Sequence, residues 1–124
     1  MPTFSWEPLD FLEALEVSPV EEEYGISYRY LVSRGSVFLS LTIWPLNCDV
    51  EILLGNARGA EPLVRLNLLD CPGARVMRDD ERTYIEFCAA KVFGGRYDQT
   101  HTPPYGFRLQ LEPFIQISTF SYPV

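Results

Sequence analysis

The stretch Ser36-Val37-Phe38-Leu39-Ser40-Leu41-Thr42-Ile43-Trp44 decides the fold of this 124-residue chain. Its residues alternate with period two, so an extended backbone separates them into two faces. One face carries Val37, Leu39, Leu41 and Ile43, and the other carries Phe38, Ser40, Thr42 and Trp44. Because the first set is entirely aliphatic, the pattern predicts a β-strand with one face against a core.

Similar alternation continues on both sides of this stretch. Residue types and periodicity predict strands over residues 24–32, 36–44, 49–54, 63–69, 74–78, 82–89, 106–111 and 114–120. Turn-forming residues separate several of them, including Asp70-Cys71-Pro72-Gly73 and Asp79-Asp80-Glu81. The predicted fold is mainly β, an antiparallel sandwich or strongly curved sheet of about 7–8 strands.

The N-terminal segment has a different periodicity. Pro8 suits a first helical turn, and Ser18-Pro19 is expected to end the helix. Between them, apolar residues near helical spacing predict one short amphipathic helix over residues 8–17: Leu9, Leu12, Ala14, Leu15 and Val17. We expect one globular domain over residues 1–124, in which an acidic, helical segment 1–23 packs over an open face or edge of a β body 24–124.

The charge of the chain is concentrated at its N-terminus. The net charge is -7, and seven of the 17 acids lie in the first 23 residues, which hold no Lys or Arg. Nucleic acid and anionic membranes are therefore disfavoured as partners, whereas a basic protein is favoured. Within this segment Glu21, Glu22 and Glu23 are the candidates for a surface that steers a partner.

The cysteines and the chain start indicate the compartment. Cys48, Cys71 and Cys88 are an odd set without a C-x-x-C pair, so we expect buried structural thiols, no metal site and no cofactor. The first residues lack the basic region of a secretory signal, and no apolar run reaches the roughly 20 residues of a membrane helix. A cytoplasmic location is the expectation.

One long segment, residues 91–105, has no sustained periodicity and is rich in aromatic and charged side chains. Aromatic and Arg residues are enriched at binding hot spots, so the segment is a candidate protein-binding loop. Alternatively, Phe93 and Tyr105 pack beneath the loop as a small core of its own. The candidate binding residues are Phe93, Arg96, Tyr97, Asp98, His101 and Tyr105.

Catalytic motifs are missing from the sequence. His101 is the only histidine, and no nucleophile elbow, phosphate-binding loop or zinc-protease pattern is present, so we expect a protein that is not an enzyme. No segment matches a family motif residue for residue. In size, acidity and its short N-terminal helix, the chain is similar to single-domain immunity proteins, which neutralise toxins in bacteria. That resemblance implies a protein-binding module that caps a partner.

Two other function classes stay open. The aromatic residues Tyr28, Tyr30, Trp44 and Tyr84 either form a patch that stacks on a sugar or another small ligand, or cover the sheet beneath the helix. An exposed sheet edge could instead pair with a second copy in an oligomeric structural subunit. The identity of the partner, the strand order and the choice between monomer and homodimer do not follow from the sequence.

Overall fold

The computed structural model describes residues 3–56, 61–90, 92–95 and 97–122. This part contains a short helix, two 3-10 turns and nine strands. In chain order they are α1 (Pro8–Leu15), β1 (Val20–Glu21), η1 (Glu23–Gly25), β2 (Tyr28–Arg34), β3 (Val37–Trp44), β4 (Asp49–Gly55), β5 (Val64–Leu68), β6 (Ala74–Arg78), β7 (Thr83–Cys88), η2 (Val92–Gly95), β8 (Tyr105–Glu112) and β9 (Gln116–Ser121). No helix among these residues has the length and apolar character needed to cross a membrane.

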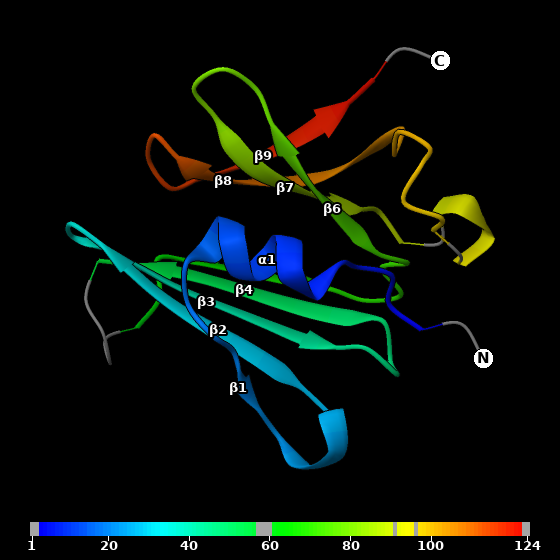
Figure 1. The fold of residues 1–124 in the computed structure, drawn as a ribbon, viewed down its shortest axis with the longest axis horizontal. Helices are drawn as coiled ribbons and strands as arrows, with labels where there is room; N and C mark the ends of the chain where they lie inside the picture. Colours follow the sequence, from blue (N-terminus) through cyan, green and yellow to red (C-terminus); the bar gives the residue numbers. More distant parts are fainter. Residues whose placement is uncertain (1–2, 57–60, 91, 96, 123–124) are drawn as a thin grey trace.

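The strands form two antiparallel sheets whose order follows the chain. The first sheet has the order β1-β2-β3-β4-β5, and the second has the order β6-β7-β8-β9. Figure 1 shows the sheets as two layers, with α1 in the space between them on one side. The expected fold class, mainly β in antiparallel sheets with one short helix, is confirmed.

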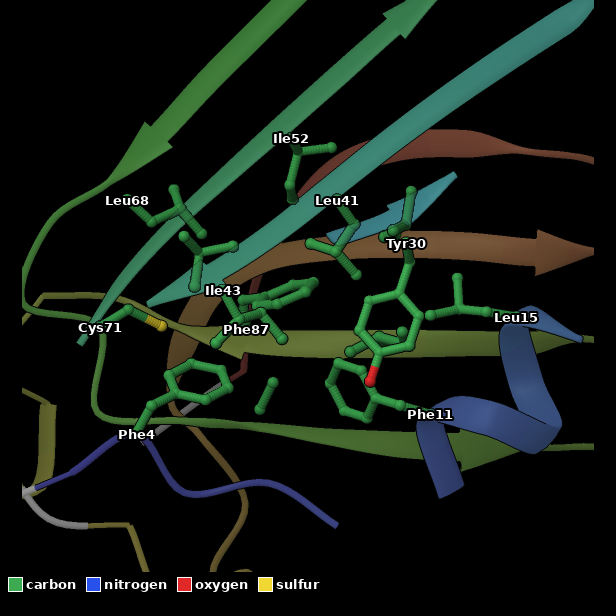
Figure 2. Close-up of a cluster of buried hydrophobic side chains, with 14 of the residues drawn as sticks. Phe4, Phe11, Leu15, Tyr30, Leu41, Ile43, Ile52, Leu68, Cys71 and Phe87 are labelled. Carbon is green, nitrogen blue, oxygen red and sulfur yellow. The ribbon is translucent and has the colours of Figure 1, made fainter. Parts of the chain in front are cut away.

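The core lies between the facing sides of the two sheets (Figure 2). On β3, Leu39, Leu41 and Ile43 are fully buried, which confirms the inward face predicted from the alternation. Leu41 lies opposite Tyr30 of β2 and Ile52 of β4, so the inward residues of neighbouring strands form a continuous apolar row. The second sheet contributes further fully buried side chains: Ile85, Phe87, Leu109 and Leu111.

Helix α1 fills the wedge between the sheets. Its Phe11 ring lies 6.2 Å from the ring of Tyr30 in the first sheet and 6.4 Å from that of Phe87 in the second. The expected helix face was partly wrong, because Leu9 is 72% exposed and the fully buried Phe11 is the central contact. The helix also ends at Leu15 instead of residue 17, since Glu16 has the left-handed φ of 60° that terminates helices.

The segment after the helix differs from the expected boundaries. Val20–Glu21 forms β1 and pairs with β2, so the described residues form nine strands and this part of 1–23 belongs to a sheet. Residues 24–27, expected to begin the next strand, reverse the chain instead, because Tyr24 and Gly25 have φ of 55° and 74°.

Arg34, at the end of β2, ties the first sheet to the second. Its guanidinium donates to the carbonyl of Leu111 and lies 3.0 Å from the carboxylate of Glu112, both on β8. It also donates to the carbonyl of Ala14 near the end of α1, at 3.5 Å. One side chain therefore joins both sheets and the helix.

Candidate binding site

The segment between β7 and β8 folds into a loop with a hollow on its surface. The hollow has a volume of about 540 Å³ and is lined, among the described residues, by Phe93, Tyr97, Asp98 and His101. The structure thus brings together four of the six loop residues that the sequence singled out. Arg96 lies outside the described residues. Tyr105 is half exposed where β8 begins and is absent from the described lining.

Aromatic rings form one side of the hollow. The rings of Phe93 and Tyr97 are stacked, with centroids 5.3 Å apart and planes 15° from parallel. The imidazole of His101 is tilted against Phe93 at 6.2 Å. Phe93 is 38% exposed, so part of its ring remains open to a partner. Phe93 therefore packs partly within the loop, against Tyr97, and partly faces the solvent.

Tyr97 supports the ring of Phe93 from the protein side. It is only 6% exposed, and burial raises its pKa to about 12. Among the described residues its hydroxyl has no hydrogen-bond partner. The stack is thus an exposed ring lying on a buried one, which holds Phe93 in place more firmly than a free surface side chain.

Asp98 organises the turn that follows. Its Oδ1 accepts hydrogen bonds from the backbone N–H groups of Thr100 at 3.0 Å and His101 at 3.2 Å, and its Oδ2 lies 2.7 Å from Nδ1 of His101. The backbone N–H groups first, and then the side chains of Thr100 and His101, hold the pKa of Asp98 well below its ordinary value. An ionised carboxylate is therefore displayed beside the aromatic rings.

Gln99 fastens the loop to the body of the protein. Its Nε2 lies 2.9 Å from the carbonyl of Ser5, 3.0 Å from Oγ of Ser5 and 2.9 Å from the carbonyl of Ala74. Ser5 itself pairs with Gly73, where a Cβ would lie 2.4 Å from the Ser5 carbonyl, so only glycine fits there. The N-terminal segment thus braces the loop, a contact that no local sequence pattern could have predicted.

Two residues of the same loop have a strained backbone conformation. Phe93 and Gln99 are non-glycine residues with φ of 61° and 69°. Such conformations cost on the order of 1 kcal/mol each and persist where the surroundings enforce them. Here the ring stack enforces the first and the Gln99 hydrogen bonds enforce the second. The hollow is therefore preorganised, which lowers the entropy cost of binding.

The acidic residues singled out in the N-terminal segment lie elsewhere. Glu21 and Glu22 are exposed at the β1–η1 hairpin, on the free edge of the first sheet, and Tyr28 donates to Glu21 at 3.4 Å. The side chain of Glu23 lies outside the described residues. Figure 1 places this hairpin well away from η2 and the loop that follows it. The expected binding residues therefore form two separate surfaces.

Tyr24 is a candidate that the sequence analysis missed. At the tip of the hairpin its side chain is 100% exposed, and the apolar residues Val20 and Ile26 beside the tip are also exposed. The available signal was the Tyr24-Gly25 pair, since glycine favours a turn and a turn exposes its neighbour. The strand predicted over 24–32 includes this pair, whereas the structure places it in a turn.

A charged cluster on the outer side of the second sheet was also missed. Glu86 of β7 is fully buried although its neighbours Ile85 and Phe87 occupy the core face. Arg75 and Arg108 lie 2.9 and 2.8 Å from its carboxylate, and the hydroxyl of Tyr122 donates to it at 2.5 Å. Strand alternation places Glu86 on the face opposite to Ile85 and Phe87, but it does not identify the neighbours that cover the carboxylate.

The aromatic patch considered for sugar binding is not formed. Tyr30 is buried beneath α1, in agreement with the alternative that these residues cover the sheet. Tyr28 contacts Trp6 at 5.5 Å, and Trp44 and Tyr84 belong to different sheets. Among the described residues no group of three or more His, Cys, Asp or Glu side chains is arranged to hold a metal ion.

Comparisons with known proteins give a single informative result. No protein-family model matches the sequence, and no curated protein matches it. Among solved structures, the fold is similar to that of a chain in the contact-dependent growth inhibition toxin–immunity protein complex from Klebsiella pneumoniae 342. The TM-score is 0.71 at 12% sequence identity, and the match covers 98% of this chain and 100% of that one. The two chains therefore share a fold over their whole lengths.

Proposed function

We propose that this chain is a non-enzymatic, immunity-type protein that binds and caps a toxin. The observation that carries the proposal is the similarity in fold, over the full length of both chains, to a chain of a toxin–immunity protein complex. The preorganised hollow at Phe93 and Asp98 supports a binding role, because it presents an aromatic ring and a carboxylate in a fixed arrangement.

The charge distribution supports the proposal that this chain is the immunity protein of such a pair and that its partner is basic. The chain carries a net charge of -7, and the exposed Glu21 and Glu22 project from the free edge of the first sheet. Complementary charge accelerates association and disfavours wrong partners. We also propose that the protein acts in the cytoplasm, where its three buried cysteine thiols would remain reduced.

The binding surface includes the loop residues Phe93, Tyr97, Asp98 and His101, with Arg96 and Tyr105 beside them in the sequence. The β1–η1 hairpin, with Tyr24 at its tip, forms a second contact region. Two separate regions suit capping, because a partner held at both is fixed in orientation.

The test has two steps. The tagged chain first captures proteins from a lysate of its own source, and mass spectrometry identifies any stoichiometric partner. That partner is then expressed in a host cell alone and together with this chain. Growth arrest by the partner alone, relieved by coexpression, is the expected result. A captured partner without toxicity, or toxicity that coexpression leaves unchanged, would overturn the immunity assignment.

A matched pair of aromatic variants locates the interface. Phe93→Ala removes the exposed ring of the loop, and Phe114→Ala removes an exposed ring from the turn between β8 and β9. The first is expected to weaken binding of the identified partner about tenfold or more, as hot-spot truncations do, and the second to leave it unchanged. The opposite ranking would place the interface outside the loop.

The other two function classes, a domain that binds a small ligand and an oligomeric structural subunit, are tested on the same protein sample. A panel of glycans in a thermal-shift assay would raise the unfolding midpoint if the protein binds a sugar, because a ligand stabilises the folded state by mass action. Light scattering over a range of concentrations would show a doubled mass if the chain pairs with itself. Either result, together with the failure to capture a partner, would replace the proposed function.

A further inference from the structure

The hollow of the 91–105 loop combines two features that together recognise a cation. Aromatic faces attract a cation through their quadrupole, and a carboxylate attracts it through charge and hydrogen bonds. Phe93 and Tyr97 supply the first feature, and Asp98 supplies the second. Its volume of about 540 Å³ is within the usual range for sites that receive a small group.

The carboxylate of Asp98 is accessible to a group that enters the hollow. Its Oδ1 accepts two backbone N–H groups, its Oδ2 lies 2.7 Å from Nδ1 of His101, and the side chain of Thr100 also hydrogen-bonds to the carboxylate. The side chain of Asp98 nevertheless remains 54% exposed. A cationic donor in the hollow can therefore reach the carboxylate through its exposed part.

The same protein already uses this combination internally. The guanidinium of Arg108 lies 4.6 Å above the ring centre of Tyr84, and one of its nitrogens lies 2.8 Å from the carboxylate of Glu86. An aromatic face beside a carboxylate thus holds an arginine in the outer face of the second sheet. At Phe93 and Asp98 the equivalent groups are present on the surface.

We propose that this hollow binds an arginine side chain of the protein partner, with the guanidinium stacked on the Phe93 ring and hydrogen-bonded to Asp98. Arginine is favoured over lysine because its planar group can stack and donate to a carboxylate at the same time. The inference rests on the proposed function, since it specifies the chemistry that the toxin presents at this loop.

The test uses the isolated chain, so it does not depend on finding the partner. N-acetyl-arginine-N-methylamide is titrated into the protein near neutral pH, while NMR follows the side-chain signals of Phe93 and His101. N-acetyl-citrulline-N-methylamide, which has nearly the same shape without the charge, is the control ligand. We expect saturable chemical-shift changes with the arginine compound. The affinity for the citrulline compound should be at least about threefold lower, as expected when an exposed charge interaction is lost.

Two variants separate the site from general charge effects. Asp98→Asn keeps a side-chain oxygen for the backbone N–H groups of the turn but removes the charge, and it is expected to weaken arginine binding about two- to fivefold. Asp80→Asn, in the exposed turn between β6 and β7, removes the same charge away from the hollow, and arginine binding should be unchanged.

Equal shifts with both ligands, no shifts with arginine, or undiminished binding by Asp98→Asn would overturn the arginine site. None of these results bears on the toxin-neutralisation assay, so a failure of this inference can be distinguished from a failure of the proposed function.

Discussion

Asp98 holds the imidazole of His101 at 2.7 Å and, through its other oxygen, the backbone N–H of the same residue at 3.2 Å. The turn between these two residues is therefore shaped before any partner arrives. These contacts distinguish the loop from a flexible surface segment, because the charged and aromatic groups of the loop keep their positions without a ligand.

The Asp98 turn is expected to depend on pH. Hydrogen bonds to the carboxylate hold the pKa of Asp98 below the ordinary value of about 3.9. Because the folded pKa is depressed, the turn is fully stabilised above the ordinary value and loses that stabilisation as pH falls through the depressed one. An NMR titration of the Asp98 carboxyl carbon should give this low pKa, and His101→Ala should raise it. A midpoint at the ordinary value would contradict the hydrogen-bonded turn.

Gln99→Ala should loosen the loop without removing a residue of the hollow. The variant loses the hydrogen bonds to Ser5 and Ala74, which is expected to reduce the free energy of unfolding by about 1–2 kcal/mol. Amide exchange in residues 97–101 should become faster. Gln116→Ala, an exposed glutamine of β9, is the matched control and should change stability by less than about 0.5 kcal/mol. Equal effects of the two variants would show that the anchor is unimportant.

Glu86→Gln is a conservative substitution, but we expect it to lower the stability of the fold strongly. It leaves Arg75 and Arg108 without their buried counter-charge, which should cost about 3 kcal/mol in a urea unfolding experiment. Glu81→Gln, in the exposed turn between β6 and β7, is the control and should have almost no effect.

The same variant has a predicted pH signature. Burial alone would raise the pKa of Glu86, but hydrogen bonds from Tyr122, Arg108 and Arg75 outweigh it and hold the pKa below its ordinary value of about 4.3. The contribution of Glu86 to stability is therefore present above that value and declines as pH falls through the folded pKa. The stability difference between wild type and Glu86→Gln should shrink in acid, and a constant difference would argue against an ionised Glu86.

Phe11→Ala tests the helix wedge. The ring contacts Tyr30 and Phe87 in different sheets, so its removal leaves a cavity where both sheets meet α1. The expected loss in the free energy of unfolding is about 3–5 kcal/mol. Leu9→Ala, on the exposed side of the same helix, should cost less than about 0.5 kcal/mol. Similar losses for both variants would contradict the observed orientation of the helix.

The cysteines are expected to be unreactive in the folded protein. Burial raises the pKa of Cys71 and of Cys88 to about 12, and it raises that of Cys48 as well. Because the thiolate is the reactive form, an aromatic disulfide reagent should modify none of the three until denaturant is added. Rapid modification of the native protein would show that one of these thiols is accessible.

The residue pattern alone determined the local elements. Alternation over residues 36–44 predicted β3, and the range 74–78 coincides with β6. The loop residues Phe93, Tyr97, Asp98 and His101 were identified from their types, and they do line one hollow. The strand predictions succeeded because strand periodicity is a property of a few consecutive residues. The binding role of the four loop residues stays a prediction.

Only the tertiary structure decided which distant residues meet. Phe11 replaced Leu9 as the centre of the helix face, because the buried side of α1 is the side that reaches both sheets. Gln99 anchors the loop on Ser5, 94 positions away, and Tyr122 covers Glu86 from the C-terminal segment. Such contacts depend on how the sheets stack and where the chain ends cross them. Local periodicity carries no information about that packing, so the sequence by itself determined the strands, whereas the packing decided the wedge, the buried charge and the shape of the hollow.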